Sequence, residues 1–378
     1  MNTVIPSFVQ HRIRGFSMVD LLVGIAIGIL GLLAVTKVLV DFNKSRNTTV
    51  QLMETQNNGA MAMYLLERDL AQAGYGLMPL LNCSTVQWYY TQQKSAFSPV
   101  PVAISDGGAS SDVISVQYGK NSSGIPAVTI TQNQPSYTAP YTVASITGFI
   151  VGDQIVTDSG SVCTLGQVTT VNNVSYTISR TYDAVTPGNT PYLPDPSNLP
   201  ANAGTAWHSD SAATTQATVA NLIAVNGAQL VNLGQFVGNS YSASNNALNV
   251  GSFPGYATTP LVDGVTMIKA QYGLDNNSDG IVDSWSPGYN IGAGTGFQVS
   301  NTNAKQVIAI RVGVVVRSPL FEKNVVAQPA TLTVLPDTTG TLPGDSFTYT
   351  VPTAGNGDHY RYKVYYTVIP LKNVIWGR

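Results

Sequence analysis

An uninterrupted apolar stretch near the N-terminus constrains this chain more than any other feature. It runs for 20 residues from Leu21 to Val40, and Thr36 and Lys37 are its only strongly polar residues. A helix of about 20 apolar residues is long enough to cross the hydrocarbon core of a membrane. Lys37 lies near the end of the stretch, where its long side chain can reach the polar interface. The sequence therefore predicts one membrane-spanning helix over roughly residues 16–40.

The flanks of the stretch predict its orientation. Arg12 and Arg14 precede it, whereas the flank after it is mixed, with Asp41 and Lys44. Positive charge keeps the flank that carries it in the cytoplasm. We therefore expect the leader to lie in the cytoplasm and the long C-terminal part of the chain to be exported.

The leader, residues 1–15, ends in a small residue. An ordinary secretory signal is cut after its apolar region at an Ala-x-Ala-like site, and no clear site of that kind follows Val40. A cut after Gly15 would instead leave Phe16 as the new N-terminus and retain the whole helix. Asp20 would then be the fifth residue, where an unpaired carboxylate is costly in lipid.

The stretch RGFSMVDLL resembles the class III signal of type IV prepilins, which has a basic leader, Gly, Phe and an acidic fifth mature residue. The resemblance implies that prepilin peptidase cuts after Gly15 and methylates Phe16. It also implies that the Asp20 carboxylate docks against the N-terminal amine of a neighbouring subunit in the fibre. The family usually has Glu where this chain has Asp20, which is one methylene shorter. The alternative is an uncleaved signal anchor that happens to contain an Asp.

The helical pattern continues beyond the apolar stretch. Apolar residues at spacings of three, four and seven indicate one helical face, which consists of Val50, Met53, Ala60, Met63, Leu66 and Leu70. Asn57-Asn58-Gly59 is a weak point at which we expect a kink. Gly74, Gly76 and Pro79 predict the end. We therefore expect one long helix over residues 16–78, with its outer half packed on a globular head.

Residues 79–378 are expected to form a β-rich head. Short segments rich in β-branched and aromatic residues, separated by Gly, Pro and Asn, predict strands at 85–91, 112–119, 127–132, 175–180, 217–225, 265–274, 305–318, 330–336, 346–352 and 360–372. The Pro-rich segment 186–204 is either an irregular loop or a boundary between two subdomains. The predicted fold class is α+β, with a long N-terminal helix on a large β-rich head.

Composition argues against several classes of function. Charged residues make up 10% of the chain and the net charge is −2, so a nucleic-acid partner has no electrostatic support. The sequence contains no HExxH, GxSxG, P-loop or CxxC motif. We therefore expect a protein that is not an enzyme.

The two cysteines, Cys83 and Cys163, both follow the apolar stretch. An exported domain lies in an oxidising environment, so the two cysteines predict one disulfide. The alternative is two buried free thiols.

The segment DNNSDGIVD matches the first nine positions of a calcium loop. Its oxygen ligands at positions 1, 3, 5, 7 and 9 are, in order, Asp275, Asn277, Asp279, the carbonyl of Ile281, and Asp283. Ser286 replaces the usual bidentate Glu at position 12, so that ligand would have to come from water or elsewhere. The segment predicts a structural Ca²⁺ site, and the alternative is a metal-free hairpin turn.

A narrower resemblance covers the helix and several later strands. The segments YLLERDLAQAGYG, SDVISVQYG, LVDGVTMIKAQYGLDNNSDGIVDSW, VIAIRVGVVVRS and HYRYKVYYTVIPLKN occur in the order seen in PilW-like minor pilins. The resemblance implies a minor subunit of a type IV pilus, or fimbrium, that helps to initiate assembly and lies at or near the tip. Residues 120–260 carry no motif of this kind.

The same resemblance implies partners and a location. The partners would be other minor pilins, the major pilin, prepilin peptidase, the inner-membrane assembly platform and a tip adhesin that takes part in cell adhesion. The subunit would lie in the bacterial inner membrane with its head in the periplasm, and later in the extracellular pilus. One alternative is a pseudopilin of a type II secretion system. The other is a bitopic, membrane-anchored protein whose exported domain binds a ligand.

Overall fold

The structure is a computed structural model that describes residues 17–90, 93–121, 123–124, 127–135, 139–158, 163–180, 224–253, 257–336 and 346–377. Its internal contacts divide the chain into two units, Met1–Met53 and Glu54–Arg378. The leader with Gly15 and Phe16 and the Pro-rich segment 186–204 lie outside the described residues. So does most of the strand predicted at 217–225, and Ala224 and Val225 at its end are not in a strand.

The first element is the helix α1 (Met18–Gln72), which contains the whole apolar stretch. It ends before residue 78, because Gly74 takes the left-handed conformation with φ of 81° and cannot continue the helix. The Gly74 amide instead donates to the carbonyl of Gln117, 2.9 Å away. A short 3-10 helix, η1 (Met78–Asn82), then leads into the sheets.

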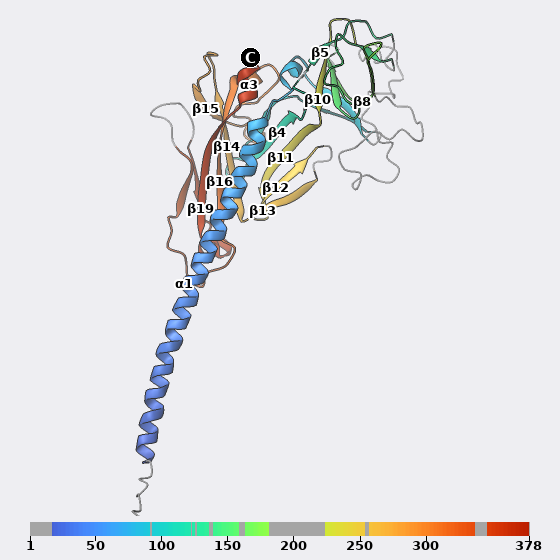
Figure 1. Ribbon diagram of the computed structural model, residues 1–378. Coiled ribbons are helices and arrows are strands. Elements are labelled where there is room, and N and C mark those ends of the chain that lie inside the picture. Colours follow the sequence, from blue (N-terminus) through green and yellow to red (C-terminus); the bar gives the residue numbers. More distant parts are fainter. Residues whose placement is uncertain are drawn as a thin grey trace, which may run out of the picture. The chain divides into compact units, whose positions relative to one another are not determined.

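Two antiparallel sheets hold most of the core. The five-stranded sheet has the order β13 (Thr258–Asp263), β12 (Ala247–Ser252), β11 (Phe236–Ser244), β4 (Val113–Gly119) and β3 (Val102–Ser105). The four-stranded sheet has the order β15 (Ser284–Pro287), β14 (Val265–Leu274), β16 (Val307–Arg317) and β19 (Tyr362–Pro370). The largest cluster of buried residues joins the outer part of α1 to these two sheets, and that part of the helix runs beside β16 and β19 (Figure 1).

The remaining strands form an eight-stranded and a two-stranded sheet. The larger sheet has the order β2 (Gln93–Phe97), β1 (Val86–Tyr90), β8 (Cys163–Asn172), β7 (Gln154–Asp158), β10 (Gln229–Gly234) and β5 (Ala127–Thr129), with β9 (Thr177–Arg180) joining β8 to β6 (Tyr141–Thr142). The two-stranded sheet is β17 (Thr331–Leu335) and β18 (Phe347–Thr350). Three short helices, η3 (Ala304–Gln306), η4 (Ala354–His359) and α3 (Lys372–Trp376), complete the described elements.

The predicted combination of a long N-terminal helix with a large β-rich C-terminal part is confirmed. Strands β1, β4, β5, β9, β14 and β16 to β19 lie within predicted segments. The sequence did not predict β2, β3, β6 to β8, β10 to β13 or β15. Most of those strands are rich in Ser, Thr, Asn, Gln and Gly, and their extended shape depends on partners that are distant in sequence.

The expected apolar face of the outer helix was partly wrong. Val50, Met53 and Ala60 are exposed, whereas Met63, Leu66 and Leu70 are buried as predicted. The buried stripe has regular spacings of four and three residues, and it consists of Thr55, Gly59, Ala62, Leu66, Asp69 and Ala73. Five of these six are not large apolar residues, so hydrophobicity alone could not identify the whole face.

The kink expected at Asn57-Asn58-Gly59 is also absent, since α1 passes through these residues without a break. Gly59 has a different function: a β-carbon there would overlap the ring of Tyr365 on β19. The Tyr365 hydroxyl reaches the carbonyl of Thr55 at 3.4 Å. The glycine therefore allows the sheet to approach the helix closely.

Candidate functional site

The first candidate site is the apolar surface of α1. Every large apolar side chain from Met18 to Phe42 is more than half exposed, from 51% at Val23 to 87% at Met18. The helix is long and apolar enough to cross a membrane. Soluble proteins rarely expose continuous apolar patches beyond a few hundred Å². This surface therefore requires lipid or other apolar helices around it.

Polar groups on this part of the helix are few and mostly satisfied. The Thr36 hydroxyl donates to the carbonyl of Leu32 at 2.6 Å, so it needs no external partner in lipid. Asp20 lies exposed in the first turn of α1. A carboxylate there is favoured by the positive end of the helix dipole. Its docking against an N-terminal amine stays a prediction, because Phe16 lies outside the described residues.

The second candidate site is a buried carboxylate on the outer half of α1, which the sequence analysis did not single out. Asp69 is fully buried in the stripe that faces the sheets. Its Oδ2 accepts hydrogen bonds from the Tyr241 hydroxyl at 2.6 Å and from Asn239 Nδ2 at 2.7 Å, both on β11. Its Oδ1 accepts from Arg68 Nε at 3.0 Å. The sequence did contain a signal for this site. Asp69 lies three residues after Leu66 and four before Ala73, and this spacing places its carboxylate on the buried face of the helix.

The Asp69 cluster changes the acid–base properties of its neighbours. Burial and then the Asp69 carboxylate raise the pKa of Tyr118 to about 12. The same two causes raise the pKa of Tyr241 further. The hydrogen bond to Asp69 raises the pKa of Arg68, whose side chain is half exposed. Both tyrosines therefore stay neutral donors at physiological pH, so the cluster positions the helix on β11 and is not suited to proton transfer.

The predicted disulfide between Cys83 and Cys163 is present in the structure, with Cα atoms 5.8 Å apart. It joins the end of η1 to the first residue of β8, and both cysteines are fully buried. Asp158 lies beside them. Because both sulfur atoms are engaged in the disulfide, these three residues do not make a metal site.

The predicted calcium loop lies between β14 and β15. Asp275 is buried, and its carboxylate accepts three backbone amides of the loop, from Ser278 at 2.6 Å, Asp279 at 3.2 Å and Gly280 at 2.8 Å. Asp283 Oδ2 accepts the amide of Asn276 at 2.7 Å. The loop is thus a tight turn organised by its own carboxylates.

The donor set of this loop fits Ca²⁺ in chemistry, since all its side-chain ligands are oxygens. Asp275, Asp279 and Asp283 do not bring their carboxylate oxygens within 4.8 Å of one another, and the described residues contain such a group only at Cys83, Asp158 and Cys163. Calcium binding would therefore have to draw the exposed Asp279 and the half-buried Asp283 toward Asp275. It stays a prediction.

We expect the double substitution Asp275→Asn/Asp279→Asn to abolish any rise in melting temperature that Ca²⁺ causes. Removing two carboxylates removes most of the charge that would hold the ion. The measurement is thermal unfolding of the full chain in detergent, with Ca²⁺ and with chelator. Asp263→Asn, an acidic substitution outside the loop, is the matched control. An equal loss of stability in chelator and in Ca²⁺ would show that the carboxylates act only as turn acceptors.

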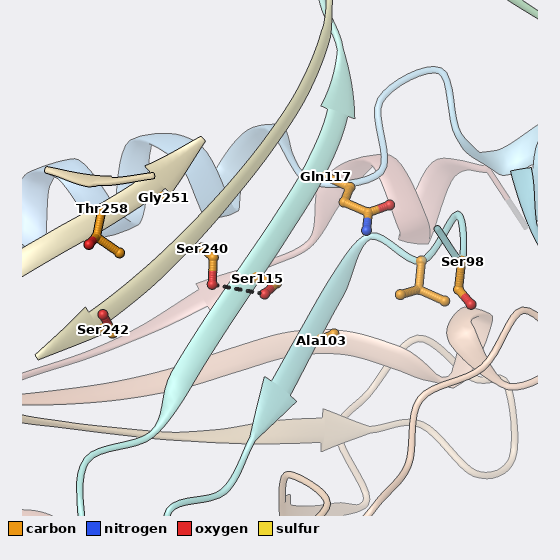
Figure 2. Close-up of a pocket in the computed structure, with 9 residues that line it drawn as sticks. Ser98, Ala103, Ser115, Gln117, Ser240, Ser242, Gly251 and Thr258 are labelled. Carbon is orange, nitrogen blue, oxygen red and sulfur yellow. Dashed lines mark hydrogen bonds between the residues drawn. The ribbon is translucent and has the colours of Figure 1, made fainter. Parts of the chain in front are cut away.

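A shallow cavity of about 420 Å³ opens on the five-stranded sheet (Figure 2). It is lined by Ser98, Val100, Ala103, Ser115, Gln117, Ser240, Ser242, Gly251 and Thr258. The Ser115 and Ser240 hydroxyls hydrogen-bond to each other at 3.2 Å across β4 and β11. Gln117 is buried, and its Oε1 has no hydrogen-bond partner. The lining contains no charged residue, so the cavity offers hydrogen bonds to a neutral group and no acid or base.

Comparison with known proteins finds a similarity in the C-terminal part of the chain. The family of type IV pilus-assembly protein W, PilW, matches residues 237–373, from β11 to α3. This match confirms the predicted resemblance for that region, which includes the two strands β14 and β16 and the loop between β14 and β15. No curated protein matches the chain.

Among solved structures, a type IV-like pilin from Thermus thermophilus resembles this protein. The alignment covers 84% of this chain and 97% of the pilin, with 9% sequence identity and a TM-score of 0.32.

Proposed function

We propose that this protein is a minor pilin of a type IV pilus. It is made as a prepilin, cut after Gly15 by prepilin peptidase and methylated on Phe16. It then helps to initiate the pilus and lies at or near the tip. The observation that carries this proposal is that one chain contains both a region matched by the PilW family and an exposed apolar helix with Asp20 in its first turn.

The exposed surface of α1 supports a role in two successive environments. Before assembly, the stretch from Leu21 to Val40 lies in the inner membrane and the residues after it lie in the periplasm. During assembly the same side chains pack against the helices of other pilins. Gly24 and Gly28 have no atoms within 4 Å of the positions that β-carbons would occupy, so another helix can approach closely there.

The globular region then carries partner specificity. Its partners are other minor pilins and the major pilin, with the assembly platform on the membrane side and a tip adhesin beyond. The protein is a substrate of prepilin peptidase and not itself an enzyme. A structural Ca²⁺ in the loop 275–283 would stabilise this region.

The mature N-terminus tests this proposal. We expect protein extracted from the membranes of its own host to begin at methylated Phe16, because the leader is removed and the helix is retained. Mass spectrometry of the N-terminal peptide is the measurement. Gly15→Leu is the control, and it should keep the leader. A wild-type chain that begins at Met1, or that is cut after Val40, would contradict the proposal and leave a membrane-anchored or secreted domain.

A further inference from the structure

A lysine and two aspartates meet in the interior, away from the helix and the calcium-like loop. Lys269 on β14 is buried, and its Nζ lies 2.6 Å from Oδ1 of Asp112, which is also buried. The same Nζ lies 3.1 Å from Oδ1 of Asp106. Asp112 immediately precedes β4, so the cluster joins the five-stranded sheet to the four-stranded sheet.

The backbone holds the Asp112 carboxyl group in one orientation. The Asp112 amide donates to the carbonyl of Ile268 at 2.9 Å. The amide of Ala270 donates to Asp112 Oδ2 at 2.9 Å, and the amide of Gly107 donates to Oδ1 at 3.0 Å. Two N–H groups aimed at one carboxyl would stabilise negative charge on its oxygens, as in an oxyanion hole.

The two carboxyl groups differ in acidity. Burial raises the pKa of Asp112 to about 6, although Lys269 opposes this shift. Burial also raises the pKa of Asp106, but hydrogen bonds from Lys269, the Gly108 amide and Asp112 outweigh it, so that pKa is lowered overall. Two carboxyl groups whose pKa values are pushed apart can act as a protonated electrophile and an ionised base.

We propose that Lys269 and Asp112 join in an intramolecular isopeptide bond. Asp106 takes one proton from the Lys269 ammonium, and the neutral amine attacks Cγ of Asp112. The Cγ–Oδ1 bond breaks, and Oδ1 leaves as water after receiving the proton that Asp106 holds. An ammonium and a neutral carboxyl thus give one amide, one water and one proton, which passes to solvent through the partly exposed Asp106. No other reactant is needed.

The surroundings favour this condensation over a lasting ion pair. Burying two charges carries a large desolvation cost, whereas the amide is neutral. The ring of Phe347 lies 4.6 Å from Nζ and shields it from solvent. Fixed groups at this distance react with effective concentrations far above those in solution. A cavity of about 160 Å³ beside Asp106, Asp112 and Lys269 gives the released water a way out.

The bond would link residues that are 157 positions apart in the sequence. It would tie the two sheets that pack against α1 by a covalent cross-link that reducing agents do not break. Such a link would let the globular region carry tension without separating its sheets. This inference goes beyond the proposed function and does not depend on it.

Peptide mapping of the full chain tests the proposal. We expect a protease digest of the folded wild-type protein to contain a branched peptide joining Lys269 to Asp112, lighter than its two linear parts by the mass of one water. Trypsin should fail to cut after Lys269. Asp106→Asn should slow formation of the bond by about 100-fold or more, because the proton acceptor is removed. Lys269→Arg keeps the positive charge but should give only linear peptides.

Only linear peptides from the wild-type protein would overturn the proposal. A branched peptide that forms as fast in Asp106→Asn would overturn the role of Asp106. Near-ultraviolet circular dichroism of each variant shows whether it is folded, so that a failure to react is separated from a failure to fold. A mature N-terminus at Phe16 has no bearing on the result.

Discussion

Replacing both Cys83 and Cys163 with alanine is expected to lower the free energy of unfolding by about 4–5 kcal/mol. The disulfide closes a loop with a sequence separation of 80, and cross-linking such a loop removes much of the entropy of the unfolded chain. Both cysteines also lie in a buried cluster with Leu80, Val86 and Leu165, so the substitution removes some packing as well. The shift in the urea midpoint of the full chain in detergent measures the effect.

The loss should be concentrated in the eight-stranded sheet. The cross-link lies where β1 pairs with β8, at Val86 and Cys163. We expect limited proteolysis to cut the variant within β7, β8 or β9 before it cuts the two sheets that pack against α1. Reductant should destabilise the wild-type protein to a similar extent and leave the double variant unchanged. A variant as stable as the wild type would mean that the two thiols contribute no more than ordinary buried side chains.

Replacing Asp69 with alanine is expected to cost about 3–5 kcal/mol. The carboxylate is fully buried and accepts hydrogen bonds from Tyr241 and Asn239. Its removal leaves both donors unsatisfied in the interior, where each lost partner of a charged group costs about 1.5–3 kcal/mol. The melting temperature of the full chain, followed by near-ultraviolet circular dichroism, should fall accordingly.

Arg68→Ala is the matched control for Asp69→Ala. The Arg68 side chain is 49% exposed, so solvent screens its ion pair with Asp69 and we expect a loss of only about 0–1 kcal/mol. Asp69→Asn, which keeps one acceptor oxygen, should lie between the two. If Arg68→Ala and Asp69→Ala were equally destabilising, the ion pair and not the bonds to β11 would hold the helix.

The features that the sequence predicted correctly depend on residues that lie close together in the chain. A run of apolar residues, the residues that flank it and the carboxylate at Asp20 are all contained within one short segment, so their consequence for a membrane helix follows from composition and order. The turn at Asp275 is local in the same way, since its carboxylate bonds amides three to five residues ahead. The disulfide could be predicted because the chain has two cysteines and both lie in the part that is expected to be exported.

The rest required contacts between distant residues. Strands such as β11 and β12 contain Ser, Asn and Gly and show little apolar alternation, so their pairing partners determine them. The helical stripe includes Thr55, Gly59 and Asp69. Their burial is explained only by their contacts in the folded protein: Thr55 and Gly59 lie against Tyr365, and Asp69 accepts a hydrogen bond from Tyr241.

By itself, then, the sequence determined an apolar N-terminal helix and a β-rich region after it, because hydrophobic periodicity acts over a few residues. Only the tertiary structure decided which face of α1 is buried, and that Asp69 and Lys269 have partners far along the chain. The reason is that burying a charged group is favourable only when specific partners surround it. For both residues those partners include a residue more than 100 positions away in the sequence.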